Sequence, residues 1–126
     1  MKIAAMIARY LLGLGFVVFG LNAFFHFMPP PELPGPGAEF MGLMFESGYF
    51  NFVAVIKIVG GLLLLLGRFV PLGLTLLGPV LVNILLFHIA FDPAGIVMGL
   101  VFTVLWFAVF WQNKTSFRTV LSVDGR

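Results

Sequence analysis

Residues 71–91 read PLGLTLLGPVLVNILLFHIAF, and this stretch decides the fold class. It contains no Asp, Glu, Lys or Arg, and Asp92-Pro93 follows it as a strong stop and turn signal. At about 1.5 Å per residue, a helix of this length covers the ~30 Å hydrocarbon core of a bilayer. The stretch therefore predicts a membrane-spanning helix.

Three other apolar stretches predict further spans, at about residues 8–28, 50–67 and 95–112. The first is longer than the apolar region of a signal peptide, about 7–15 residues, and it ends in FFHFM (residues 24–28) without an Ala-x-Ala cleavage pattern. We therefore interpret it as a retained helix. The expected fold class is an all-α integral membrane protein, a single domain formed by a four-transmembrane-helix bundle over residues 1–126.

The composition supports this fold class, because 61% of the residues are hydrophobic and only 10% are charged. A soluble domain is about half apolar and a quarter charged, so the apolar excess must face lipid. The chain has no Cys, which excludes disulfides, thiolate nucleophiles and thiolate metal ligands. No basic cluster indicates nucleic-acid binding. Any redox role would need a bound cofactor or a partner.

Residues 29–49 form a Pro-rich loop between the first two spans. The segment PPPELPGPG (residues 29–37) predicts extended backbone outside the hydrocarbon, where water satisfies its polar groups. From Ala38 to Ser47 the apolar positions recur three and four apart, which predicts a short interfacial helix.

The basic residues that flank the spans predict the orientation of the chain. All of them fall on one side of the four predicted spans: Lys2, Arg9, Arg68, Lys114, Arg118 and Arg126. The loops of the opposite side contain no Lys or Arg, and their charged residues are all acidic: Glu32, Glu39, Glu46 and Asp92. Both termini, including the tail at 113–126, are therefore expected to be cytoplasmic, and the short helix extracytoplasmic.

Glycines occur where close helix packing is expected, since helices in lipid associate through small residues and polar contacts. They lie in the first span at Gly13, Gly15 and Gly20, in the second at Gly60 and Gly61, and in the fourth at Gly95 and Gly99. The last two form a GxxxG pair that could join copies of the chain into a homo-oligomer.

Six polar residues are candidates for a ligand-binding pocket in the outer half of the bundle: Asn22, His26, Glu46, Lys57, Asn83 and His88. A charged group at the centre of a spanning helix costs about 2.5–3.5 kcal/mol, so such residues usually face a partner or a cavity. Lys57 is expected to pair with Glu46 or Glu39. The asparagines have an alternative role as hydrogen bonds between helices, and the histidines as wet surface residues. No spacing selects a metal site, and no catalytic residue is indicated.

Three segments resemble the DoxX-like family of small bacterial membrane proteins. They are RYLLGL to FGLN at residues 9–22 with the following His26-Phe27, GGLLLL to GRFVP at 60–71, and VNILLFH at 82–88. The resemblance implies a multi-pass protein of the bacterial inner (cytoplasmic) membrane. One feature departs from the family pattern: Ala54 and Lys57 stand where relatives often carry a Lys and, one turn later, a Glu. An intramembrane carboxylate is therefore missing, which weakens a proton-relay role inferred from relatives.

The resemblance also implies a quinone-associated or redox-complex membrane subunit, with a quinone as the expected cofactor and a partner redox subunit. Whether the chain itself catalyses a reaction stays open. The alternative is a non-catalytic membrane scaffold, or a protein that binds a lipid or apolar small molecule. A small transporter ranks lower, because four short helices make a small pathway.

Overall fold

The computed structural model describes residues 2–25 and 35–118, and every regular element within these ranges is helical. Four helices are long and apolar enough to span a membrane, and the short helix α2 lies between the first two of them. The all-helical prediction is thereby confirmed. The elements in chain order are α1 (Lys2–Phe25), α2 (Pro36–Glu46), α3 (Tyr49–Leu66), α4 (Val70–Phe91), η1 (Pro93–Gly95), α5 (Ile96–Gln112) and η2 (Lys114–Phe117).

The observed helices lie close to the predicted spans, and the largest difference is at the start of the chain. Helix α1 begins at Lys2, about two turns before the apolar stretch, since the good helix former Ala occurs at 4, 5 and 8 and no Gly or Pro interrupts the segment. Helix α3 ends at Leu66, and the following Gly67 has a φ of 69°, the left-handed conformation typical of a residue that ends a helix.

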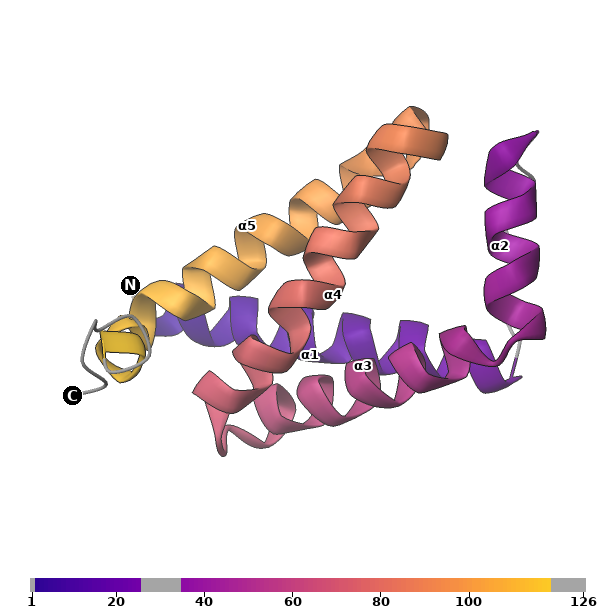
Figure 1. Cartoon of the computed structure of the whole chain (residues 1–126). Helices are drawn as coiled ribbons and strands as arrows, with labels where there is room; N and C mark the ends of the chain where they lie inside the picture. Colours follow the sequence, from indigo (N-terminus) through magenta and orange to yellow (C-terminus); the bar gives the residue numbers. More distant parts are fainter. Residues whose placement is uncertain (1, 26–34, 119–126) are drawn as a thin grey trace.

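Helices α1 and α3 run antiparallel to each other (Figure 1), and their backbones are in direct contact at glycines. A Cβ atom added at Gly13 would lie 2.8 Å from the Gly61 carbonyl oxygen, and one at Gly61 would lie 2.7 Å from the Gly13 carbonyl oxygen. Only glycine fits at both positions without moving the helices apart. Gly20 extends the same seam, because its added Cβ would lie 3.0 Å from the Ala54 carbonyl oxygen. The predicted packing role of these glycines is confirmed.

Helices α4 and α5 form a second pair, which packs against the first pair, α4 on α3 and α5 on α1. Gly60 of α3 faces α4, and a Cβ added there would lie 2.8 Å from Cγ of Leu77. Trp106 of α5 donates its indole N–H to the Leu74 carbonyl oxygen at 3.0 Å. The side chains that are most completely buried around these contacts are Leu12, Phe16, Leu64, Leu74, Leu77 and Val109.

The two pairs diverge toward the end of the bundle that carries α2 (Figure 1). We call this end, with Glu39, Glu46 and Asp92, the acidic end, and the α1–α3 and α4–α5 pairs the two arms. Helix α2 contacts both arms through aromatic rings. Its Phe40 ring lies 5.5 Å and 5.4 Å from the Phe87 and Phe91 rings of α4, between centroids. Its Phe45 ring lies 4.9 Å from the Phe50 ring of α3.

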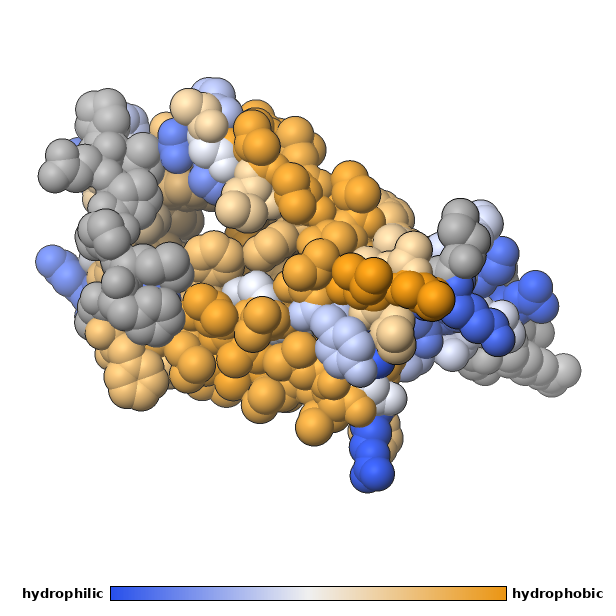
Figure 2. All heavy atoms as spheres, turned by 180° about the vertical axis from the view of Figure 1, so that it is seen from behind, coloured by the Kyte–Doolittle hydropathy of each residue, from blue (hydrophilic) through white to orange (hydrophobic). Residues whose placement is uncertain are grey.

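The opposite end, which we call the basic end, carries Lys2, Arg9, Arg68, Lys114 and Arg118. There Arg9 donates a hydrogen bond to the Leu64 carbonyl oxygen in the last turn of α3, where a cation is favoured. Hydrophobic side chains cover the middle of the face shown in Figure 2, and hydrophilic side chains gather toward its two ends. Together with the four long apolar helices, this distribution indicates a multi-pass membrane protein.

Candidate functional site

The structure distributes the predicted site residues over both arms. Asn22 on α1 and Lys57 on α3 are half-buried within the α1–α3 arm, and His88 is half-buried at the far end of α4. Glu46 is exposed at the end of α2. His26 lies outside the described residues. Because the arms diverge, the end of α4 lies apart from the adjoining ends of α1 and α3 (Figure 1).

Asn83 lies on an exposed face of α4, and its side chain bonds to its own helix. Its amide nitrogen donates to the Pro79 carbonyl oxygen at 3.0 Å, one turn earlier. The amide thus forms its hydrogen bond within its own helix and contacts no other polar side chain among the described residues. Asn83 is therefore not combined with the other candidates in the described part of the chain.

Lys57 does not form the predicted ion pair with Glu39 or Glu46. In residues 2–25 and 35–118, the one acidic and basic pair of side chains within ion-pair distance is Asp92 and His88. The physical reason is the placement of α2, which turns Phe40 and Phe45 toward the arms and leaves both glutamates exposed. Lys57 instead lies about two turns into α3, on the side that faces α1.

The seam between α1 and α3 restricts where the Lys57 side chain can go. A Cβ added at Gly20 would lie 3.3 Å from the Lys57 Cβ, so α1 closes one side of the stem. In a helix each Cα–Cβ bond tilts toward the N-terminus, and the N-terminus of α3 is at the acidic end. The long apolar stem can therefore carry the ammonium toward the acidic end, as lysines near membrane interfaces do.

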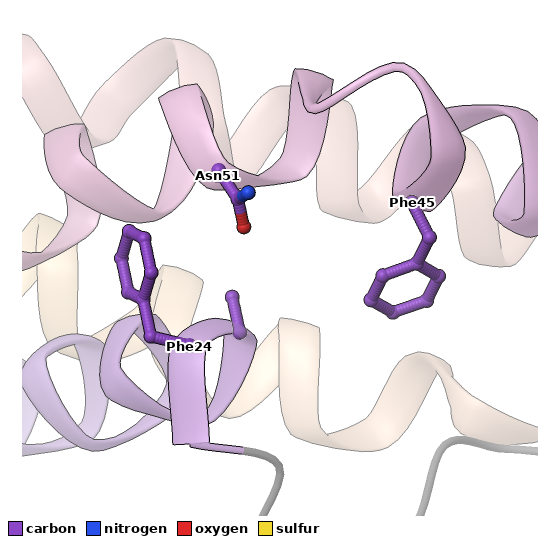
Figure 3. A pocket seen from close by; sticks show the side chains of 4 residues that line it. Phe24, Phe45 and Asn51 are labelled. Atoms are coloured by element: carbon purple, nitrogen blue, oxygen red, sulfur yellow. The ribbon is translucent and has the colours of Figure 1, made fainter.

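An open cavity of about 330 Å³ lies at the acidic end of the α1–α3 arm, and Ala23, Phe24, Phe45 and Asn51 line it. Figure 3 shows the Asn51 amide projecting from its helix into the gap between the rings of Phe24 and Phe45. Three elements thus contribute to the cavity: the last turn of α1, the last turn of α2 and the first turn of α3. Its volume is at the lower limit of typical small-molecule sites, about 300–1,000 Å³.

Sequence reasoning missed Asn51, because it lies between Phe50 and Phe52 at the edge of an apolar stretch. An amide between two aromatic residues in the first turn of a helix could have drawn attention to it. The sequence could not show that Asn51 lines a cavity, since the cavity depends on where α2 packs. Asn51 lies six residues before Lys57, which is about 9 Å along the helix axis.

The lining of this cavity suits a flat molecule with a carbonyl oxygen. Aromatic rings pack against a planar ligand by offset stacking or edge contacts, and the Asn51 amide offers two N–H donors to an acceptor. Lys57 is on the same helix, but it lies six residues further along and about 120° around the axis, and it does not line the cavity. A quinone head group has this combination of a flat ring and carbonyl acceptors, so the residues present fit it.

A second polar site lies at the acidic end of the α4–α5 arm, formed by His88 and Asp92. The Nδ1 atom of His88 lies 3.2 Å from the Asp92 backbone oxygen and 3.6 Å from its carboxylate Oδ2. The Gly95–Gly99 pair faces this site within the chain. A Cβ added at Gly95 would lie 2.8 Å from Cε1 of His88, and one at Gly99 would lie 3.2 Å from Cδ2 of Leu85. The prediction that the glycine pair joins two copies of the chain stays a prediction.

Comparison of the chain with models of protein families, with curated proteins and with solved structures finds no match. Membership of the DoxX-like family therefore stays a prediction, which rests on the three sequence segments that resemble it. The function proposed for the chain rests on those segments and on the geometry of the acidic end.

Proposed function

We propose that the chain is a DoxX-like membrane subunit of a redox complex and that it binds a quinone head group at its acidic end. The observation that carries the proposal is the cavity lined by Ala23, Phe24, Phe45 and Asn51. It combines two aromatic rings with one amide at the acidic end of the α1–α3 arm. A quinone bound there would have its isoprenoid tail in the lipid between apolar helix faces.

The residues of the cavity have distinct roles in this proposal. Phe24 and Phe45 hold the two sides of the ring, and the Asn51 amide donates a hydrogen bond to a ring carbonyl. When bound, a quinone supplies a carrier of two electrons and two protons. The chain has no Cys, so the electrons pass to a partner redox subunit.

Mass spectrometry of small molecules that co-purify with the protein in mild detergent tests this proposal. We expect the wild type to retain a quinone, and the Asn51→Leu variant to lose about three- to tenfold of it, the size of one lost neutral hydrogen bond. Asn83→Leu is the matched control, because this amide is exposed on the other arm. Bulk phospholipid alone in all samples, or equal quinone in the wild type and Asn51→Leu, would contradict quinone binding.

A protein that binds a lipid or another apolar small molecule is the second candidate function. It is favoured by the same cavity, in which three of the four lining residues are apolar. The mass spectrometry distinguishes the two, since this candidate predicts a defined lipid that Asn51→Leu releases while quinone is absent. A purely structural scaffold predicts no defined molecule at all.

We further propose that the protein lies in the bacterial inner membrane with both termini cytoplasmic. The basic end, with Lys2, Arg68 and Lys114, supports this orientation by the positive-inside rule. Because the chain has no Cys, an introduced thiol is the only one. A membrane-impermeant thiol reagent should label Ser47→Cys in intact spheroplasts and Thr115→Cys only after lysis. The reverse pattern would contradict the orientation.

A further inference from the structure

The guanidinium of Arg9 is held against the end of helix α3, at the basic end of the α1–α3 arm. Its Nη1 donates to the Leu64 carbonyl oxygen, and a Cβ added at Gly67 would lie 2.8 Å from Nη1 and 3.4 Å from Nη2. Its Cζ also lies 4.6 Å from the centroid of the Tyr10 ring, within the range of a cation–π contact. These contacts hold the guanidinium where α1 meets the turn between α3 and α4.

This guanidinium keeps most of its hydrogen-bonding capacity. An arginine carries five N–H donors, and among the described residues Arg9 bonds to one acceptor. No carboxylate of residues 2–25 and 35–118 lies within ion-pair distance of it, because Glu39, Glu46 and Asp92 all lie at the acidic end. Asp124, the remaining acidic residue on this side of the spans, lies outside the described residues. The half-buried cation therefore has donors for an anion that the described part of the chain does not supply.

The turn after α3 adds a second cation and a strip of exposed apolar side chains. Arg68 directly follows Gly67 and is exposed. Leu66 and Phe69, on either side of it, are 70% and 71% exposed, and Leu62 is exposed one turn before Leu66 on the same face of α3. Cationic groups beside an apolar strip match a molecule with an anionic head group and a hydrocarbon chain.

We propose that Arg9 and Arg68 bind the phosphate of an anionic phospholipid at the basic end. The planar fork of Arg9 donates paired N–H bonds to the phosphate oxygens, a geometry that arginine offers and lysine does not. Arg68 adds its charge from the turn, and one acyl chain lies along Leu62 and Leu66. An anionic lipid is favoured over a zwitterionic one, because the ammonium of a choline head group would lie beside two arginines without a carboxylate.

Native mass spectrometry of the purified protein in detergent, titrated with lipid, measures this binding. We expect one phosphatidylglycerol to bind about fivefold or more tightly than phosphatidylcholine with the same chains, the effect of one basic residue near an anionic head group. Equal affinities would overturn the proposal. Soluble glycerophosphoglycerol has the same head group without the chains and should not displace the lipid at equal concentration. Its displacement of the lipid would mean a site for a soluble phosphate and would also overturn the proposal.

Substitutions that each remove one positive charge locate the site. Arg68→Gln breaks no contact between helices and should weaken phosphatidylglycerol binding about fivefold. Arg9→Gln should weaken it at least as much, because the paired donors are also lost. Lys114→Gln is the matched control: it removes the same charge from the same end, but this ammonium lies over the Trp111 ring of α5, at 4.0 Å. It should change the affinity less than about twofold, since salt screens distant charges. Equal weakening by Arg68→Gln and Lys114→Gln would overturn the site.

Two further variants separate this site from other partners and from the quinone cavity. Asp124→Asn should leave phosphatidylglycerol binding unchanged, whereas tighter binding would mean that the Asp124 carboxylate competes for the arginines and would contradict the lipid as their resident partner. Asn51→Leu should also leave it unchanged, although this variant is expected to release quinone. Loss of phosphatidylglycerol from Asn51→Leu would place the lipid in the cavity and overturn the site at the basic end. The lipid site does not depend on quinone binding, so either proposal can fail while the other stands.

Discussion

The two arms consist of equally apolar helices, yet they are held together by different kinds of contact. The candidate spans of the α1–α3 arm have mean hydropathies of 1.9 and 2.1, and those of the α4–α5 arm 2.1 and 2.2. In the first arm the backbones touch at Gly13 and Gly61, where each glycine lies against the carbonyl oxygen of the other. In the second arm, side chains fill the interface: Trp106 bonds to a backbone carbonyl, and His88 lies against Gly95.

This difference teaches that hydropathy sets the number of helices and not the manner of their packing. Backbone contact leaves no space for a large side chain, so the α1–α3 arm keeps its cavity at the acidic end, beyond the glycine seam. Contact through side chains leaves room for a ring, so the α4–α5 arm can hold His88 inside its interface. Helix α2 joins the arms through Phe40 and Phe45 and thereby completes the cavity.

The largest effect is expected from Gly61→Leu, which breaks the backbone contact of the α1–α3 arm. A side chain at 61 meets the Gly13 carbonyl oxygen at 2.7 Å, and backbone cannot move aside as a side chain can. We expect a loss of about 3 kcal/mol or more in the free energy of unfolding, at the upper end for overpacking. Reversible unfolding in mixed micelles, followed by circular dichroism, measures this loss.

Gly42→Leu in α2 is the matched control for Gly61→Leu, since a Cβ added at Gly42 has nothing within 4 Å. It should be neutral or slightly stabilising, because Leu is the better helix former. Similar losses in the two variants would show that the α1–α3 seam is looser than the structure has it.

A smaller loss is expected from Gly95→Ala in the α4–α5 arm. The added methyl meets the Asp92 Oδ2 at 2.6 Å and the His88 ring at 2.8 Å, and both are side-chain atoms that can shift. We expect about 1–2 kcal/mol in the same unfolding measurement. Gly99→Ala should cost less, because its nearest neighbour is the flexible Leu85 side chain at 3.2 Å. A loss from Gly95→Ala that equals that of Gly61→Leu would remove the distinction between the arms.

The single hydrogen bond between α5 and α4 should contribute less again. Trp106→Phe removes the donor to the Leu74 carbonyl oxygen, and the expected loss is about 1 kcal/mol. Trp111→Phe is the control, since Trp111 is 65% exposed and donates no hydrogen bond among the described residues. The difference between the two unfolding free energies measures the bond, and no difference would contradict its role.

The sequence predicted the features that depend on local composition. The four apolar helices and the short helix before α3 follow from hydropathy, Pro71 and the Asp92-Pro93 stop, and the structure has them. The seam at Gly13, Gly20 and Gly61 was also predictable, since small residues mark close helix contacts in lipid.

The features that depend on the angle between the arms could not be predicted. Lys57 was expected to pair with a glutamate of α2, yet both glutamates are exposed because α2 uses its phenylalanines for packing. Asn51 gained its place in a cavity only through Phe45, which approaches from another helix. The Gly95–Gly99 pair suggested contact between two copies of the chain, and periodicity alone could not show that its neighbour is His88 of the same chain.

The smallest effect is expected from Asn83→Leu, which tests whether polarity within a span is itself a sign of function. The Asn83 amide is exposed and donates to the Pro79 carbonyl one turn earlier in its own helix. Its removal breaks no contact between helices, so the free energy of unfolding should change by less than about 0.5 kcal/mol. Retained small molecules should also be unchanged. A loss of 1 kcal/mol or more, or of a bound molecule, would instead mean that the exposed face of α4 binds a partner in the membrane.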